Sequence, residues 1–232
     1  MTIGIIGAME PEVAGLINAL EENSVIKTAM TEIHTGKLKG KDVAIVQCGI
    51  GKCAAAAVTA LLIDRCKPSA VINTGCAGAL APDLKIGDMV ISSKAAYHDA
   101  DLTPFGYSKG QMAGHDLYFN ADSELMAKAG IAAGNIPELK GKIKTGLIVS
   151  GDQFINISTQ KNAIVQLFPD AKVCEMEGAS IAHICHDCGV PFLIVRAVSD
   201  EASEGVTVAY DEFMPKAAAL SAKLVTALLP LL

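Results

Sequence analysis

An apolar segment from Pro191 to Asp200 constrains the fold more than any other part of the chain, because it carries one arginine, Arg196, in its middle. Such a segment predicts a strand buried in a sheet. Burying Arg196 is costly unless a carboxylate pairs with it. The segment ends on Ser199 and Asp200, and open α/β sheets bind their ligands at the carboxyl ends of strands. We therefore expect a buried sheet with a functional site at one end of this strand.

Candidate partners for the arginine lie at Glu175 and Glu177, two acids at alternate positions. Alternation sends both carboxylates to one side if the backbone is extended there. The simplest interpretation is one structural ion pair between Glu177 and Arg196, with Glu175 solvated. The alternative is that the acids belong to a functional site, and these residues alone do not decide between the two.

The chain has 232 residues and contains no linker, charge block or low-complexity tract, which predicts one domain over residues 1–232. Hydrophobic residues make up 51% and aromatic residues 4%, so the core must be built of small aliphatic side chains, as in parallel α/β sheets. The expected strands lie near residues 2–7, 31–38, 42–48, 70–75, 87–96, 142–149 and 192–199. The expected helices begin near residue 10 and lie near residues 52–66, 122–133, 158–167, 177–188 and 211–229. A hairpin between the second and third strands makes the predicted sheet mixed.

Charge and hydropathy patterns favour a small-molecule partner. The net charge is -6, and the 19 lysines and arginines are scattered, which argues against a nucleic-acid surface. The first residues read as a strand without a basic leader, and no apolar run approaches the length of a membrane span. We expect a soluble, cytoplasmic protein with no membrane partner.

The seven cysteines do not indicate a disulfide framework. A segment with Cys185, His186, Asp187 and Cys188, close to His183, resembles a metal or redox motif. It is predicted to be one helix, however, and no second cysteine pair has ligand spacing. We expect no metal site and no cofactor.

Two glycine motifs, at residues 4–7 and 49–52, lack the three-glycine fingerprint of dinucleotide-binding proteins. No Walker-type phosphate loop is present either. A long irregular segment from Tyr97 to Asn120 is more informative, since long ordered loops tend to be functional. Its acids and His98 are the ligand types of a metal site, but its aromatic residues better suit a pocket wall or a subunit contact.

Five segments form a joint pattern: GIIGAMEPE at 4–12, NTGCAG at 73–78, SGDQFI at 150–155, EME at 175–177 and RAVSD at 196–200. Together they resemble the 5′-methylthioadenosine/S-adenosylhomocysteine nucleosidases of the nucleoside phosphorylase superfamily. The resemblance implies a single-domain three-layer α/β/α sandwich around a mixed β-sheet, in a homodimer.

The resemblance also implies a reaction. The enzyme would hydrolyse the N-glycosidic bond of 5′-methylthioadenosine and S-adenosylhomocysteine, with 5′-deoxyadenosine or aminodeoxyfutalosine as further candidates. Adenine leaves poorly as an anion, so an acid must protonate its N7, and a carboxylate must activate water. By the family pattern Asp200 is the acid and Glu12 is the base, and their protonation must differ.

The pattern further implies how the substrate is held. Glu177 would accept hydrogen bonds from the ribose, and Arg196 would fix Glu177 and help hold the water. Phe154 would stack on adenine and the backbone of Ile155 would read it. The full set of substrate-binding residues implied is Met9, Ile50, Cys76, Ala77, Gly78, Phe154, Ile155, Glu175, Met176, Glu177, Arg196, Ser199 and Tyr210. A 5′-alkylthio pocket would add residues reaching in from a dimer partner, namely Leu102, Phe105 and Tyr107.

Two positions depart from the family pattern. Cys76 stands where many members have serine, and a thiol donates a weaker hydrogen bond than a hydroxyl. If the family's serine contacts the catalytic acid or the ligand, Cys76 loosens that contact and alters the protonation of Asp200. Tyr210 stands where phenylalanine is common and adds a hydroxyl to the apolar pocket.

Two rival functions remain at this point. A nucleoside phosphorylase would share the fold, but phosphate needs cationic or N–H neighbours, whereas the first loop offers Glu10 and Glu12. A catalytically silent nucleoside-binding protein gains nothing from two acids of opposed protonation. Methionine salvage, methyl-cycle detoxification and menaquinone synthesis all remain open as pathways.

Overall fold

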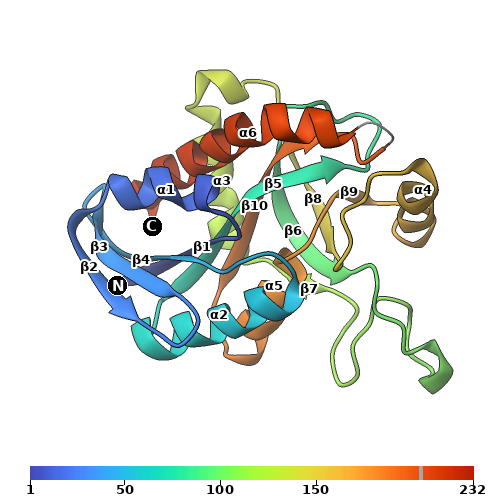
Figure 1. The fold of residues 1–232 in the computed structure, drawn as a ribbon, viewed down its shortest axis with the longest axis horizontal. Coiled ribbons are helices and arrows are strands. Elements are labelled where there is room, and N and C mark those ends of the chain that lie inside the picture. Colours follow the sequence, from blue (N-terminus) through green and yellow to red (C-terminus); the bar gives the residue numbers. More distant parts are fainter. Residues whose placement is uncertain (204–205) are drawn as a thin grey trace.

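A mixed sheet of ten strands runs through the molecule and separates two layers of helices (Figure 1). The computed structural model describes residues 1–203 and 206–232. At the centre of the sheet β1 (Thr2–Gly7) pairs in parallel with β4 (Lys41–Gln47) on one side and with β5 (Ala70–Ala79) on the other. Strand β10 (Phe192–Asp200), which contains Arg196, pairs in parallel with β5.

Half of the sheet closes on itself. Strand β5 pairs with both β10 and β9, and the remaining pairings complete a ring through β6 and β8. These three further strands are β6 (Met89–Tyr97), β8 (Ile143–Ser150) and β9 (Ala171–Glu175). The short β7 (Phe119–Asn120) pairs with β6 outside the ring. Closure buries β10 on both faces, as its apolar sequence predicts.

The other half of the sheet ends in β3 (Glu32–Leu38) and β2 (Glu21–Lys27). The β3–β4 hairpin confirms the predicted antiparallel pair. The sequence did not predict β2. Six of its seven residues are exposed, so its sequence has neither an apolar run nor an alternating pattern to indicate a strand.

Helices cover both faces of the sheet (Figure 1). One layer consists of α1 (Glu10–Asn18), α3 (Ser123–Gly134) and α6 (Val206–Leu228), and the other of α2 (Lys52–Cys66) and α5 (Gly178–Asp187). Helix α4 (Ser158–Leu167) packs beside β8 and β9. Single 3₁₀ turns lie at Thr103–Phe105, Pro137–Leu139 and Leu229–Leu231. The predicted three-layer α/β/α sandwich is confirmed.

Helix α6 corrects the expectation that no apolar run approaches the length of a membrane span. Residues Glu212–Leu231 have a mean hydropathy of 1.2 over a helix long enough to cross a bilayer. The buried side of this helix, with Leu224, Val225 and Leu228, packs in one core cluster with Ile72 and Val195 of the sheet. This helix is therefore apolar because one side of it is buried in the core of the fold.

The topology brings distant segments to one edge of the sheet. The parallel strands β1, β5 and β10 all end there, so the residues that follow β1, the glycines of β5 and the end of β10 become neighbours. Helix α6 braces this edge, because Ser221 Oγ lies 2.7 Å from Thr74 Oγ1 and accepts from the Gly75 N–H at 3.1 Å. The predicted functional residues lie at this edge.

Candidate active site

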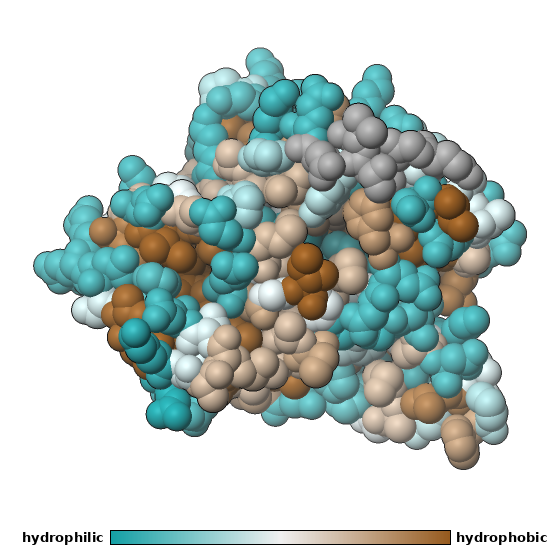
Figure 2. Space-filling model, in the orientation of Figure 1, coloured by the Kyte–Doolittle hydropathy of each residue, from teal (hydrophilic) through white to brown (hydrophobic). Residues whose placement is uncertain are grey.

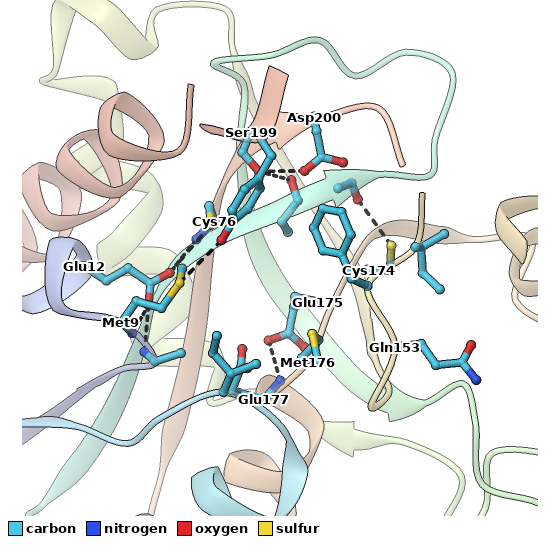
Figure 3. A pocket seen from close by; sticks show the side chains of 17 residues that line it. Met9, Glu12, Cys76, Gln153, Cys174, Glu175, Met176, Glu177, Ser199 and Asp200 are labelled. Carbon is cyan, nitrogen blue, oxygen red and sulfur yellow. Dashed lines mark hydrogen bonds between the residues drawn. The ribbon is translucent and has the colours of Figure 1, made fainter. Parts of the chain in front are cut away.

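A pocket of about 510 Å³ opens at this edge of the sheet (Figure 3). It is lined by both expected catalytic acids and by every expected binding residue of the main pocket except Arg196, which lies behind it. The lining residues are Ala8, Met9, Glu12, Ile50, Cys76, Ala77, Gly78, Gln153, Phe154, Ile155, Cys174, Glu175, Met176, Glu177, Ser199, Asp200 and Tyr210. The five sequence segments thus converge on one cavity.

Arg196 is only 1% exposed and is paired chiefly with Glu175. Its Nη2 donates to Glu175 and, at 2.6 Å, to Asn73 Oδ1. Glu177 Oε2 lies farther away, at 3.8 Å. The predicted pair of Glu177 with Arg196 is thus present as the weaker of two ion pairs, and the prediction that Glu175 is solvated is wrong, because Glu175 is buried. Burial alone would raise the pKa of Glu175, but Arg196 and the Ser150 hydroxyl outweigh it and lower that pKa.

The two glutamates separate because the backbone turns between them. Glu175 is the last residue of β9, whereas Glu177 is the N-cap residue of α5. Glu175 accepts hydrogen bonds from the Glu177 and Gly178 N–H groups at the start of this helix. Glu177 is left at the pocket, where its Oε1 accepts from the Gly51 N–H at 2.9 Å. Gly51 adopts a φ of +94°, which favours glycine at this position.

Glu177 is buried, and Arg196 lies farther from it than from Glu175. Burial, together with the neighbouring Glu175 carboxylate, raises the pKa of Glu177 to about 7. Arg196 acts in the opposite direction but is already engaged by Glu175. Glu177 is thus a carboxyl group that gains or loses its proton near neutral pH.

Glu12 enters the site from the first turn of α1. Its Oε2 accepts from the Ala8 N–H at 2.7 Å and from the Met9 N–H at 3.0 Å. Its Oε1 accepts from the Cys76 N–H at 3.2 Å. The side chain is 3% exposed, and three backbone donors hold it in one orientation.

Gly75 permits the close approach of Glu12 and Arg196 over β5. A Cβ atom at this position would lie 2.5 Å from Glu12 Oε1 and 2.8 Å from Arg196 Nη1. Within residues 1–203 and 206–232, Arg196 Nη1 and Nε have no hydrogen-bond partner. A donor of Arg196 and an acceptor of Glu12 therefore flank the same position.

Asp200 lies across the pocket from Glu12 (Figure 3). Its Oδ2 accepts from the Ser199 hydroxyl at 2.8 Å and its Oδ1 accepts from the Ala202 N–H at 2.9 Å. Burial raises the pKa of Asp200 above its usual range, although these two donors act in the opposite direction. The charge of Lys161 also acts to lower this pKa, but burial outweighs it. Asp200 is therefore the acid that retains its proton most readily on that side of the pocket.

Cys76 contacts the base rather than the acid. Its Sγ lies 3.7 Å from Glu12 Oε1. Burial and the Glu12 carboxylate raise the pKa of the thiol to about 12, so the thiol stays protonated and donates. We therefore expect Cys76 to act on Glu12 and not on the protonation of Asp200.

The apolar part of the pocket is formed by rings and thioethers. Phe154 is 41% exposed and meets the Tyr210 ring edge-on, with the ring centroids 5.3 Å apart. The Tyr210 hydroxyl lies 3.4 Å from Met9 Sδ, so the extra oxygen of this tyrosine faces a thioether. Met176 completes this lining near Glu177.

Leu102, Phe105 and Tyr107 do not line the pocket of their own chain. They lie on the long loop between β6 and β7, which extends from the body at the lower right of Figure 1. Phe105 is 79% exposed. The base of this loop is fixed by an ion pair of 2.6 Å between Lys52 Nζ and Asp99 Oδ1. Their expected role as residues contributed by a partner stays a prediction.

Three lining residues were not expected from the sequence. Ala8 and Gln153 lie inside segments 4–12 and 150–155, so adjacency to the predicted residues was an available signal. Cys174 lies in β9 beside Glu175, and its short apolar strand gave no sign that a thiol reaches the pocket.

Comparison with known proteins identifies the family. A model of the phosphorylase superfamily matches residues 2–230. The structure of a 5′-methylthioadenosine/S-adenosylhomocysteine nucleosidase from Neisseria meningitidis, in complex with methylthio-immucillin-A, is 41% identical with a TM-score of 0.97, over 100% of this chain and 99% of that chain. A Colwellia psychrerythraea nucleosidase in complex with adenine is 43% identical with a TM-score of 0.94, over 99% and 95%. This chain belongs to the phosphorylase superfamily, among its 5′-methylthioadenosine/S-adenosylhomocysteine nucleosidases.

The family resemblance seen in the sequence is thus confirmed, and the nucleosidase is an N-glycosyl hydrolase. A futalosine hydrolase of Helicobacter pylori is also similar, at 31% identity and a TM-score of 0.93, over 100% of this chain and 98% of that chain. The fold therefore occurs in enzymes named for different nucleosides.

The raised pKa of Glu177 predicts a pH-dependent effect of replacing it. Because the pKa is higher in the folded chain, folding favours the protonated form of Glu177. This contribution to the free energy of unfolding is complete below the unfolded-state pKa of 4.5 and is lost as the pH rises through about 7. The nucleosidase variant Glu177→Gln, which keeps an acceptor for Gly51, should match the wild type at pH 5. At pH 8 it should be more stable, by up to about 3 kcal/mol. Urea unfolding at both pH values measures the difference.

The exposed Glu201→Gln variant is the control and should change little at either pH. A Glu177→Gln variant that is less stable than the wild type at pH 8 would show that the ionised carboxylate is stabilising, contrary to this account.

Proposed function

We propose that this nucleosidase hydrolyses the N-glycosidic bond of 5′-methylthioadenosine and S-adenosylhomocysteine, releasing adenine and the 5′-thio-substituted ribose. The observation that carries the proposal is the contrast between two buried acids facing one pocket. Asp200 lies where burial favours its protonated form, whereas Glu12 accepts from three backbone N–H groups. An N-glycosidase needs this division between an acid and a base.

Asp200 acts as the general acid. Adenine is a poor leaving group as an anion, and a proton transferred to N7 lets it leave neutral. The Ser199 hydroxyl and the Ala202 N–H each engage one oxygen of Asp200, which fixes the carboxyl group at the pocket wall. Its raised pKa keeps the proton available at higher pH than an exposed aspartate would.

Glu12 acts as the base that orients and activates water. Arg196 Nη1 and Glu12 Oε1 flank the position above Gly75, so a water there would donate to the carboxylate and accept from the guanidinium. As the glycosidic bond breaks, the ribose becomes oxocarbenium-like, and the carboxylate takes a proton from the attacking water.

Glu177 holds the ribose. Its Oε1 is fixed by the Gly51 N–H, and its side chain lines the pocket together with Met9 and Met176. A carboxylate accepts from two sugar hydroxyls, and its negative charge stabilises a cationic sugar ring. Binding of substrate hydroxyls would favour the ionised form of a group whose pKa is about 7.

Phe154 and Ile155 bind the base. A half-exposed phenyl ring offers a flat stacking surface to adenine, and the edge-on contact with Tyr210 orients it. The backbone of Ile155, which is buried at the same wall, supplies hydrogen-bonding groups to the purine edge.

The distribution of arginines disfavours phosphorolysis. The chain has two arginines, Arg65 and Arg196. Arg65 is exposed at the end of α2, and Arg196 is neutralised by Glu175. Among the described residues that line the pocket there is no lysine or arginine. A phosphate dianion would meet Glu12 without a free cation to neutralise it.

The reaction assay that tests this proposal measures adenine release from 5′-methylthioadenosine, with and without phosphate, and identifies the sugar by mass. We expect phosphate-independent release with free methylthioribose. Asp200→Asn should lower kcat by about 100-fold or more, since it removes a general acid. The wild-type rate should fall as pH rises through the pKa of Asp200, and this alkaline limb should vanish in the variant.

Glu201→Gln, one residue beyond the acid, is the matched control and should retain wild-type kcat. Sugar 1-phosphate formed only with phosphate present would mean a phosphorylase. The enzyme could release adenine from 5′-deoxyadenosine or aminodeoxyfutalosine but not from 5′-methylthioadenosine. That result would assign it a different substrate within the same family. Binding of all these nucleosides without adenine release from any would indicate a silent binder.

Cys76→Ser tests the contact to the base. A hydroxyl donates a stronger hydrogen bond to Glu12 than the thiol does, and one such bond is worth about 1 kcal/mol. We expect kcat to rise by roughly twofold to tenfold with little change in KM. A clearly lower kcat, in a variant with unchanged thermal stability, would contradict this role of the thiol. Cys174→Ser, at the opposite wall, is the matched control.

We further propose a homodimer in which the partner completes the 5′ end of the pocket. Ile50, which lines the pocket, is 59% exposed, and the outer surface of α2 carries alanines that appear as a pale-brown area in the lower middle of Figure 2. Phe105 is an exposed apolar side chain that does not reach its own pocket. A cytoplasmic role in methionine salvage and nucleoside catabolism fits the proposed products.

Light scattering should give about 48 kDa, twice the 24.0 kDa of one chain. Phe105→Ala should raise KM for 5′-methylthioadenosine severalfold, because an apolar contact of this size contributes about 1–3 kcal/mol. Met30→Ala removes another exposed apolar side chain, at the far edge of the sheet, and should leave KM unchanged. A monomeric mass, or wild-type KM in Phe105→Ala, would contradict the shared pocket.

A further inference from the structure

A second cluster of titratable side chains lies at the end of α5 remote from the pocket. Glu177 begins this helix at the pocket, and Asp187 ends it ten residues later, about 15 Å along its axis. His183 and Asp187 lie one turn apart on α5, and His115 approaches them from the long loop between β6 and β7. None of the three lines the active-site pocket.

The three side chains converge on one point. His115 Nε2 lies 2.9 Å from Asp187 Oδ1, and His183 Nε2 lies 3.5 Å from Asp187 Oδ2. One ligand atom from each residue lies within 4.8 Å of the others. A tetrahedral ion with bonds of about 2 Å holds its ligand atoms about 3.3 Å apart, so small side-chain rotations bring this set to bonding distance.

The far side of each imidazole is also engaged. His183 Nδ1 lies 3.0 Å from the Tyr97 hydroxyl, and its ring stacks on Phe119 with centroids 4.8 Å apart. His115 Nδ1 lies 3.1 Å from the carbonyl oxygen of Ala113. Partners of this kind, on the nitrogen away from the ion, orient the histidine ligands of metal sites.

Hydrogen-bond accounting at His115 requires a proton or a metal ion at its Nε2. The Ala113 carbonyl only accepts, so His115 Nδ1 must carry a proton. In a neutral imidazole the lone pair is then on Nε2, which faces the Asp187 carboxylate at 2.9 Å. Two acceptors cannot remain at this distance unless a proton or a metal ion lies between them.

We propose that His115, His183 and Asp187 bind one divalent transition-metal ion of the Zn²⁺ type. Two imidazoles and one carboxylate are ligands that zinc takes readily, with water in the fourth position, whereas calcium and magnesium prefer sets made of oxygen atoms. The ion replaces the proton that His115 would otherwise need.

The proposed ion would cross-link the long loop to α5. It joins His115, near the end of the segment 98–118, to the last turn of α5. Figure 1 shows α5 beside β7, at the base of this loop. A cross-link that restrains a long loop stabilises the folded chain, and the same loop carries Phe105. The ion would therefore act on loop order rather than on the hydrolytic chemistry.

The sequence motif alone did not predict this site. His183 and Asp187 belong to the segment in which no metal was expected, because the only cysteine pair there had no second pair to complete it. The third ligand lies 68 residues before His183 in the chain and is brought in by the loop.

The test uses full-length protein without a polyhistidine tag, freed of metal with a chelator. Isothermal titration with ZnCl₂ and elemental analysis after dialysis should give one ion per chain, with a Kd tighter than about 10 µM. His115→Ala and His183→Ala should each weaken binding by about 100-fold or more, and Asp187→Asn, which keeps a hydrogen-bond acceptor, by about tenfold or more. Zn²⁺ should raise Tm in the wild type and not in these variants.

His34→Ala, which removes a histidine of β3 outside the cluster, is the matched control and should bind like the wild type. Unchanged far-ultraviolet circular dichroism of all variants shows that they are folded. Failure to take up Zn²⁺ at about 100 µM would mean that a proton alone serves His115 and would overturn the proposal. Equal binding by the three ligand variants, as expected for an ion held by the exposed thiols of Cys53 or Cys188, would also overturn it.

Discussion

The buried ion pair between Arg196 and Glu175 is the interaction on which the rest of the site depends. Arg196 extends from the middle of β10 and is 1% exposed, so its charge requires a carboxylate inside the fold. Burial alone would lower the pKa of Arg196, but Glu175, Glu12 and Glu177 outweigh it and raise that pKa. Asn73 of β5 and Ser150 of β8 bind the same pair, which therefore joins four strands beneath the pocket.

One guanidinium is shared among three carboxyl groups, and this imbalance gives the pocket its electrostatic character. Glu175 takes most of the interaction, so Glu177 remains undercompensated, with a pKa of about 7. In the proposed reaction the sugar develops positive charge next to Glu12 and Glu177, and a surplus of negative charge there stabilises it. Asp200 lies apart from Arg196, and burial raises its pKa. Glu12, the proposed base, thus lies beside Arg196, and Asp200, the proposed acid, does not.

The sequence predicted the layers, most strands and most residues that line the pocket, because apolar runs and five segments report local structure and chemistry. It missed Glu175 as the main partner of Arg196, since alternation at 175 and 177 does not reveal that β9 ends and α5 begins between the two glutamates. Strand β2 was missed because both of its faces are exposed. The approach of His115 to α5 depends on a loop path that no local pattern encodes.

The most direct test of this account is a carbon-13 NMR titration of the side-chain carboxyl groups, assigned with the variants Asp200→Asn and Glu175→Gln. We expect Asp200 to titrate above the usual value of about 3.9 and Glu175 to stay ionised to below its usual value of about 4.3. An Asp200 that titrates at or below 3.9, or a Glu175 that is protonated near neutral pH, would contradict the claim that Arg196 divides the acids in this way.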